Sequence, residues 1–507
     1  MLSPKCSIQR YSAILPLVTG IALIVTNRWF TEVDDEIAIV DRSARPLRET
    51  IHMFLQGIGQ HEHPPLYDIL LHGWLRITSG NQHLLRLPSI IFYMLGAWTL
   101  AAAAKRLAGD SSRNWVLLLL AVWPFGFHFE RLATWYSFCF FLVALLTLVY
   151  LRFLERPTAA NWLWLVAAGL ALIYANYFGW AFLACLAVDY ILRNRGISKH
   201  SMRLVAVTMA VMLFAYIPLF RVLIKEVRFG MGVNGVGFAT IVNGIFNIYC
   251  LFVSESVAPW FWYLAVPAGI AIMSCLTIVF VMSAPEERKF LSYFFALFLF
   301  MTVAGILEPK RILFISPWLV MPIGAALGTL RVGSVRRMLA ISLAIPAAIG
   351  WYGICARNLY AAPRWVEPWE QTARQSASVV KQNGIVIGNN PSFFFYLTYL
   401  LHAEESQGDG RFKGLLPSSV RVAGVYDAGQ WIAADRPVAP VVELVKGVHY
   451  TIPATPTQEA EAWLAQHCNL RGVDRELSDT GVEWKHRYAP QIDQPEWRVE
   501  VRTYACQ

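Results

Sequence analysis

The sequence is short of charged residues. Asp, Glu, Lys and Arg make up only 15% of its 507 residues, whereas an ordinary soluble protein carries about 25%. So little charge cannot cover a globular surface of this size, which excludes a soluble enzyme. Eight cysteines are too few for a disulfide-built scaffold. Internal repeats and low-complexity tracts are also missing, which argues against a repeat architecture.

Long apolar runs are what the sequence has instead. Its hydrophobic fraction is 56%, its mean hydropathy is +0.45, and several runs approach the ~20 residues that span a bilayer. Its 19 Trp and 20 Tyr fit the aromatic belts at membrane boundaries. The first run follows Lys5 and Arg10 and lacks a small-residue cleavage site, so we expect a retained span.

Basic residues indicate how the chain crosses the membrane. The formal charge of +9 is spread over short loops and not gathered in one stripe, which favours positive-inside topology over nucleic-acid binding. With a cytoplasmic N-terminus, every predicted inside segment holds at least two basic residues, and an odd number of spans puts the C-terminal region outside. The sequence predicts about eleven spans, near residues 11–27, 88–104, 115–128, 134–151, 160–175, 178–192, 203–222, 260–282, 290–306, 311–330 and 338–355.

The first predicted outside region covers residues 28–87. Helical periodicity predicts two helices on the membrane surface, one after Pro46 and one starting at Leu66. In the second helix Asp68, His72 and Arg76 lie opposite the apolar face. A third candidate, residues 239–256, would break the charge pattern if it spanned, so we expect it to be interfacial or re-entrant.

The second outside region, residues 358–507, is long enough for a small domain. "GIVIGNN" predicts a buried strand, "TPTQEAEAWLAQHC" a helix and "WRVEVRTYAC" a strand of period two, which together indicate an α/β domain. Cys468 and Cys506 are its only cysteines and can pair if the compartment is oxidising.

Three acidic residues follow the first span directly: Asp34, Asp35 and Glu36. Mutual repulsion beside the low-dielectric membrane is expected to raise the pKa of at least one of them. Such a carboxylate suits a general base or a cation ligand. A solvated acidic turn is the alternative reading.

Further polar residues recur at predicted outer ends of spans. Cationic side chains there can bind a phosphate, and the alternative is snorkelling to the interface. His61 and His63 form only a weak metal signal, so His63 is expected to position a phosphate or an acceptor. The cations concerned are Arg86, Arg131, Lys310 and Arg311.

Two motifs in the first outside region resemble a known family. "DDEIAIV", followed by "HPPLYDILLHGWLRITSGNQHLLRLPSIIF", is similar to the signature of the dolichyl-phosphate-mannose–protein mannosyltransferase superfamily. This is the GT-C class, which includes the bacterial lipid A aminoarabinose transferases. "ERLATWYSFC" and "EPKRILF" resemble later family segments, although Thr134 stands where the family has Arg and Ile312 where it has Tyr.

The resemblance implies a mainly α, GT-C-like membrane domain over residues 1–357, in a bacterial inner membrane. The charge pattern then puts the α/β domain, residues 358–507, in the periplasm. It implies an inverting glycosyltransferase that moves a sugar from a polyprenyl-phosphate donor to a lipid, glycan or protein acceptor. The rival readings are a transporter or flippase of anionic cargo and a non-catalytic scaffold.

The resemblance also assigns roles to residues. Asp35 is the expected catalytic base, with Asp34 as its competitor, and Asp34 and Glu36 would tune the base or hold a divalent cation such as Mg²⁺ or Mn²⁺. No cofactor is otherwise implied. The residues expected to bind the donor phosphate or substrate are His63, Arg86, Arg131, Tyr136, Lys310 and Arg311.

Overall fold

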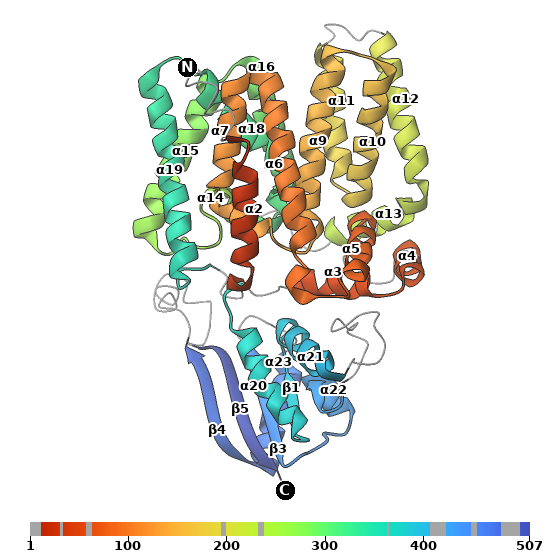
Figure 1. The fold of residues 1–507 in the computed structure, drawn as a ribbon, viewed down its shortest axis with the longest axis vertical. Coiled ribbons are helices and arrows are strands. Elements are labelled where there is room, and N and C mark those ends of the chain that lie inside the picture. Colours follow the sequence, from red (N-terminus) through yellow and green to blue (C-terminus); the bar gives the residue numbers. More distant parts are fainter. Residues whose placement is uncertain are drawn as a thin grey trace.

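The protein consists of a helical bundle and a smaller α/β domain, seen end to end in Figure 1. In this computed structural model the bundle is formed by the N-terminal part of the chain and the α/β domain by the C-terminal part. The structure describes residues 12–30, 34–56, 63–193, 199–231, 238–361, 365–405, 422–447, 454–477 and 497–506.

Each predicted span overlaps one apolar helix of the described chain. Five described stretches are long and apolar enough to cross a membrane by length and composition alone. A multi-pass membrane protein is thus confirmed, and the number of crossings stays a prediction. The overlapping helices are α2 (Leu15–Val25), α6 (Leu87–Ala108), α7 (Asp110–Ala121), α9 (Trp135–Glu155), α10 (Ala159–Ala175), α11 (Gly179–Arg193), α12 (Lys199–Tyr216), α15 (Trp262–Met282), α16 (Pro285–Val303), α18 (Pro317–Thr329) and α19 (Gly333–Ala356).

The C-terminal boundary of the span predicted at 115–128 is wrong. Helix α7 stops at Ala121, and a separate short helix, α8 (Pro124–Phe129), starts at Pro124. Proline has no backbone N–H to donate to the preceding turn, so it starts a new helix more readily than it continues one. The chain after α8 then turns toward the site described below.

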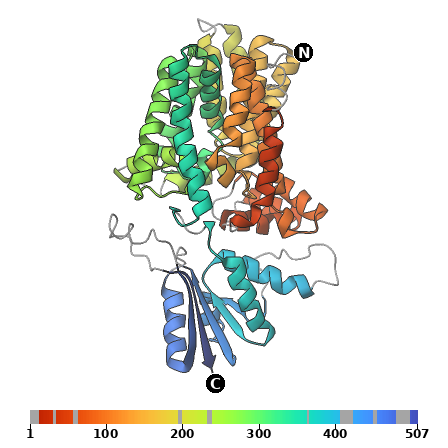
Figure 2. The same cartoon turned by 60° about the vertical axis from the view of Figure 1, so that its left-hand side comes forward.

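Three short helices, α3, α4 and α5, lie at the end of the bundle that faces the α/β domain (Figures 1 and 2). The helices predicted after Pro46 and from Leu66 are confirmed as α4 and α5. These and the remaining short helices are α3 (Asp34–Ala44), α4 (Leu47–Gln56), α5 (Leu66–Ile77), α13 (Phe220–Met231), α14 (Phe238–Val253) and α17 (Pro309–Ile312), with 3-10 turns η1 (Asn27–Trp29), η2 (Gln82–Leu84) and η3 (Ile217–Leu219).

Helix α5 buries the face that its sequence marks as polar. Asp68 and His72 are buried, whereas Ile77 is 79% exposed. His72 Nδ1 lies 2.8 Å from the Ser43 carbonyl, and Asp68 lies 3.6 Å from Arg42, both on α3. The polar stripe therefore joins α5 to α3, which leaves the apolar stripe for lipid.

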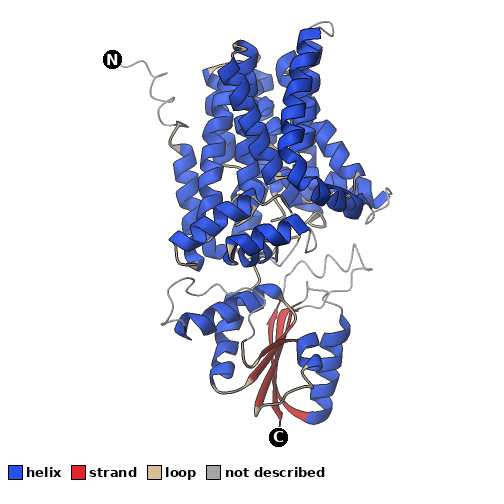
Figure 3. Ribbon diagram, turned by 90° about the vertical axis from the view of Figure 1, so that its right-hand side faces the viewer, coloured by secondary structure: helices blue, strands red, loops and turns tan. Residues whose placement is uncertain are grey.

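The α/β domain is a five-stranded mixed sheet in the order β2-β1-β3-β5-β4. Figure 3 shows the sheet with helices on both sides. Helices α20 and α21 share one core with the sheet, and α22 and α23 share the other. The strands and helices are α20 (Trp369–Lys381), β1 (Ile385–Gly388), α21 (Pro391–Glu405), β2 (Val425–Asp427), α22 (Ala428–Ala433), β3 (Val441–Gly447), α23 (Ala454–His467), β4 (Cys468–Leu477) and β5 (Trp497–Cys506).

Helix α21 joins the two parts of the protein. Its Phe395 and Tyr399 pack against the hydrophobic core of the bundle, and the helix contacts α3. The α/β domain is thus seated next to the short helix that carries Asp35.

A disulfide joins Cys468 to Cys506 where β4 and β5 are paired, with their Cα atoms 4.5 Å apart. The Cys506→Ser variant is expected to lose about 2–4 kcal/mol of domain stability, because the bond restricts the unfolded chain. Thermal unfolding without reductant measures this loss, and Cys355→Ser, which changes an exposed free thiol, serves as the control. Rapid alkylation of both Cys468 and Cys506 in the unreduced protein would contradict the bond.

Candidate active site

Asp35 lies where three elements from distant parts of the sequence meet. Its Oδ2 atom is 2.6 Å from Lys310 Nζ on α17 and accepts a hydrogen bond from the Tyr136 hydroxyl at the start of α9, at 3.0 Å. The Asp35 side chain is 37% exposed and that of Lys310 16%. The carboxylate is therefore held from one side and reachable from the other.

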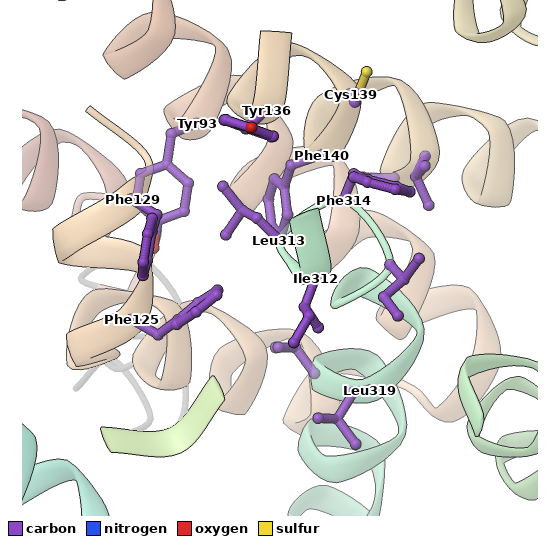
Figure 4. Packing of buried hydrophobic residues seen from close by; sticks show 14 of the residues in the cluster. Tyr93, Phe125, Phe129, Tyr136, Cys139, Phe140, Ile312, Leu313, Phe314 and Leu319 are labelled. Atoms are coloured by element: carbon purple, nitrogen blue, oxygen red, sulfur yellow. The ribbon is translucent and has the colours of Figure 1, made fainter. Parts of the chain in front are cut away.

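A firm hydrophobic layer supports Tyr136. Figure 4 shows Tyr136 above a cluster that includes Phe129, Phe140 and Phe314, and Tyr136 itself is only 2% exposed. Because its ring is fixed by this packing, the Tyr136 hydroxyl can hold Asp35 in one orientation.

The surroundings of Asp35 keep it ionised. Burial raises the pKa of the Asp35 carboxyl, but the Lys310 ammonium and the Tyr136 hydroxyl together outweigh burial and lower it to about 2. The expectation that acidic neighbours raise the pKa is wrong for this residue, because a lysine distant in sequence contacts it and Glu36 is neutralised elsewhere. Asp35 is therefore ionised at physiological pH and available as a proton acceptor, and its low pKa makes it a weak base while Lys310 is in contact with it.

This contact predicts a change in pH dependence. In wild type the base is already ionised above about pH 4, so kcat/KM is expected to show no acidic limb between pH 4 and 7. The Lys310→Met variant removes the cation and leaves burial, so an acidic limb should appear in that window. The same replacement at Lys105, in an exposed pair with Asp110, should leave the profile flat. A flat profile for Lys310→Met would show that the lysine does not control the base.

Glu36 does not share the site of Asp35, although it is the next residue. It is fully buried, and its two carboxylate oxygens accept hydrogen bonds from Arg86 Nε and Nη2 at 2.8 and 2.6 Å. Its Oε1 also accepts from the Ala133 backbone N–H. Residues adjacent in a helix point about 100° apart, so Glu36 fixes α3 in place and is no catalytic carboxylate.

The donor-phosphate roles expected for Arg86 and Arg131 are also wrong. Arg86 is 1% exposed, and besides Glu36 it donates to the Phe30 carbonyl. Arg131 is fully buried, donates to the carbonyls of Phe127 and Thr26, and lies 4.5 Å over the Phe30 ring. Both guanidinium groups are therefore buried and hydrogen-bonded to groups within the protein.

Lys310 and Arg311 remain as cations at the exposed side of Asp35. Arg311 is 24% exposed, donates from Nη1 to the Ile306 carbonyl, and has its Nε 3.5 Å from Glu308. Glu308 also lies 3.3 Å from Lys310. Glu308 is not among the site residues predicted from the sequence. Its position two residues before Lys310 could have indicated that it lies near this cation.

His63 packs near the site through its ring. Its ring centroid lies 4.5 Å from that of Trp135, the neighbour of Tyr136. His61 lies outside the described residues, and nothing is described of the Asp34 side chain. His63 therefore stays a candidate for positioning the substrate.

The described carboxylates of Asp35 and Glu36 do not fit a shared divalent cation. Asp35 is paired with Lys310 and Glu36 with Arg86, so their oxygens do not converge. Within the described part of the chain, no group of three or more His, Cys, Asp or Glu side chains comes together. The expectation of a metal bound by Asp34, Asp35 and Glu36 therefore finds no geometric support.

Helix α14 anchors the cation-bearing turn, a role that the sequence did not reveal. Asn243 Nδ2 donates to the Leu307 carbonyl at 3.0 Å, just before Glu308. Asn247 donates in turn to the Asn243 side chain at 2.9 Å. This pair of amides fixes the start of α17.

Comparisons with known proteins identify the fold. Residues 62–219 match the family model described as dolichyl-phosphate-mannose-protein mannosyltransferase. ArnT from Cupriavidus metallidurans bound to undecaprenyl phosphate is similar with a TM-score of 0.53, at 15% identity over 97% of each chain. The chain has the GT-C fold. ArnT in the apo state also gives a TM-score of 0.53, at 16% identity over 97% of each chain.

The family resemblance read from the sequence is therefore confirmed. No curated protein matches the chain by sequence. In this GT-C chain the family match covers the HPPLY segment and Tyr136 but not Asp35 or Lys310, so the contact between those two residues comes from the structure alone.

Proposed function

We propose that the protein is an inverting glycosyltransferase that uses a polyprenyl-phosphate-linked sugar. The observation that carries the proposal is the contact of Asp35 with Lys310 at the exposed edge of a GT-C bundle. It brings together a proton acceptor and a phosphate-binding cation. The fold supports the donor class, because the similar ArnT was solved with undecaprenyl phosphate bound.

The proposed reaction is a single displacement at the anomeric carbon. An acceptor hydroxyl attacks that carbon, the bond from it to the phosphate oxygen breaks, and the configuration inverts. Asp35 accepts the hydroxyl proton. Lys310 and Arg311 stabilise the negative charge that grows on the leaving phosphate, so no acid is needed to protonate it.

Lys310 would serve both halves of this reaction. In the resting state it pairs with Asp35. When a phosphate binds, Lys310 has a second anion to pair with. Its interaction with Asp35 then weakens, the pKa of Asp35 rises, and Asp35 becomes a better base. Donor binding would thus prepare the base.

The alternative, a transporter, usually needs ionisable groups along a path through the membrane. Asp189, near the C-terminal end of α11, is only 2% exposed. It accepts hydrogen bonds from Tyr150 at 2.6 Å, Tyr293 at 2.9 Å and Arg193 at 2.5 Å. The Asp189 carboxylate thus accepts hydrogen bonds from side chains of α9, α11 and α16. This role in packing the helices together favours an enzyme site at one end of the bundle over a transport path through it.

A transfer assay tests the proposal. Purified protein should release polyprenyl phosphate from a polyprenyl-phosphate sugar when membrane-extracted acceptors are added. A panel of donors that differ in the sugar identifies the sugar class. Release from none of them, with well-folded protein, would favour the scaffold.

The proposed orientation puts the N-terminus in the cytoplasm and residues 358–507 in the periplasm. Alkaline phosphatase fused after residue 360 is therefore expected to be active, because the enzyme folds only outside the cytoplasm. A fusion after Arg195, in the basic sequence between the spans predicted at 178–192 and 203–222, should be inactive. The reverse pattern would overturn both the orientation and the placement of the site on the outer face.

A further inference from the structure

Glu308 lies between the two cations of the site. Its Oε2 atom is 3.3 Å from Lys310 Nζ and 3.5 Å from Arg311 Nε. The Glu308 side chain as a whole is 44% exposed, whereas its Oε2 atom and Arg311 Nε are buried. A single carboxylate oxygen thus occupies the space between an ammonium and a guanidinium group.

The backbone fixes Glu308 in this place. It has an extended conformation just before α17, and Pro309 starts that helix. The Arg311 N–H donates to the Glu308 carbonyl at 3.0 Å, and Asn243 holds the preceding Leu307 carbonyl. These backbone contacts place the Glu308 side chain against Lys310 and Arg311.

Among the described side chains of this cluster, two carboxylates, Asp35 and Glu308, face two cations, Lys310 and Arg311. Lys310 touches both carboxylates. A phosphate oxygen favours the same two donors as a carboxylate oxygen, so a lipid phosphate and Glu308 compete for them.

We infer that Glu308 is an internal counter-anion of the phosphate site: its carboxylate lies between Lys310 and Arg311, yields to the donor phosphate, and returns as polyprenyl phosphate leaves. The inference rests on the proposed function. The donor is a phosphodiester with one negative charge. The product is a phosphomonoester with up to two, so the cations alone would retain the product more strongly than the donor.

Glu308 offsets this imbalance by competing with the product. It is a positioning and release residue, since it acts on Lys310 and Arg311 and not on the reacting atoms. Its loss should therefore tighten phosphate binding and slow release, in contrast to the loss of a phosphate ligand, which weakens binding.

The test measures binding of undecaprenyl phosphate to the full-length protein in detergent, together with transfer. The Glu308→Gln variant keeps size and removes charge, so its Kd should fall roughly 5–20-fold, as expected for one partly screened charge a few ångströms away. Its kcat should fall with its KM, because release becomes slower. Glu308→Asp keeps the charge on a side chain one methylene shorter, so its Kd should lie between those of wild type and Glu308→Gln.

Two controls separate the outcomes. Glu286→Gln, an exposed glutamate in a pair with Arg193 at the far end of the bundle, should bind as wild type does. The difference between Glu308→Gln and wild type should shrink in high salt. Equal or weaker binding by Glu308→Gln, with an active wild type, overturns the inference alone. A wild type that neither binds undecaprenyl phosphate nor transfers sugar overturns the proposed function as well.

Discussion

The Asp35→Asn variant is expected to lose at least about 100-fold in turnover, because removal of a general base typically costs 10²–10⁴-fold. Asparagine keeps the size of the side chain and can still accept the Tyr136 hydrogen bond, but it takes no proton from the acceptor. Donor binding should persist or tighten, since Lys310 loses its nearer anion. Single-turnover transfer with saturating donor measures the effect on chemistry itself.

Two neighbours on the same helix serve as comparisons. Asp41→Asn changes a carboxylate that pairs with Arg45, and it should leave turnover nearly unchanged. Asp34→Asn should be milder than Asp35→Asn. Near-normal turnover in Asp35→Asn would refute its role, and collapse in Asp34→Asn alone would transfer that role to Asp34.

The second large effect concerns stability. Arg86→Met leaves Glu36 buried without its cation, and breaking a buried ion pair costs about 3–5 kcal/mol. Glu36 is fully buried and bound to Arg86 through both oxygens, so the loss should be near the upper end. The apparent melting temperature in detergent should fall sharply, and activity should be lost at growth temperature. Because Glu36 follows Asp35, activity should decline before unfolding is complete.

The matched control is Arg106→Met. Arg106 pairs with Glu155, but both side chains are substantially exposed, at 34% and 46%, so its loss should cost below about 1 kcal/mol. The double variant Arg86→Met with Glu36→Leu should recover part of the loss, because no unpaired charge remains. Equal melting temperatures for Arg86→Met and Arg106→Met would contradict a buried pair.

The positions of the helices could be predicted well, because a helix that spans a membrane appears in the sequence as a long apolar run. Helix α9 is an example, since its predicted range, 134–151, nearly matches Trp135–Glu155. The direction of α5 could not be predicted in this way. Which face of α5 is buried depends on its packing against α3, where the Ser43 carbonyl is hydrogen-bonded to His72. The periodicity of α5 does not show which helix packs against it.

The site divides similarly. Asp35, Tyr136 and Lys310 were marked by motif and position, but their contact was not, because nothing local in the sequence links α3 to α17. Arg86 and Arg131 were placed at the site wrongly. An arginine at the end of a span looks the same in sequence whether it meets a lipid phosphate or, as with Arg131, the carbonyls of Phe127 and Thr26.

The contact of Asp35 with Lys310 also bears on how the protein is made. A chain enters the membrane from its N-terminus, and at about 5–20 residues per second the ribosome needs on the order of tens of seconds to pass from one residue to the other. Until α17 is inserted, Asp35 has no lysine and the nascent chain has no phosphate site. A polypeptide released before Pro309 would thus have the whole first outside region but neither Lys310 nor Arg311, and we expect it to be unable to consume lipid-linked sugar.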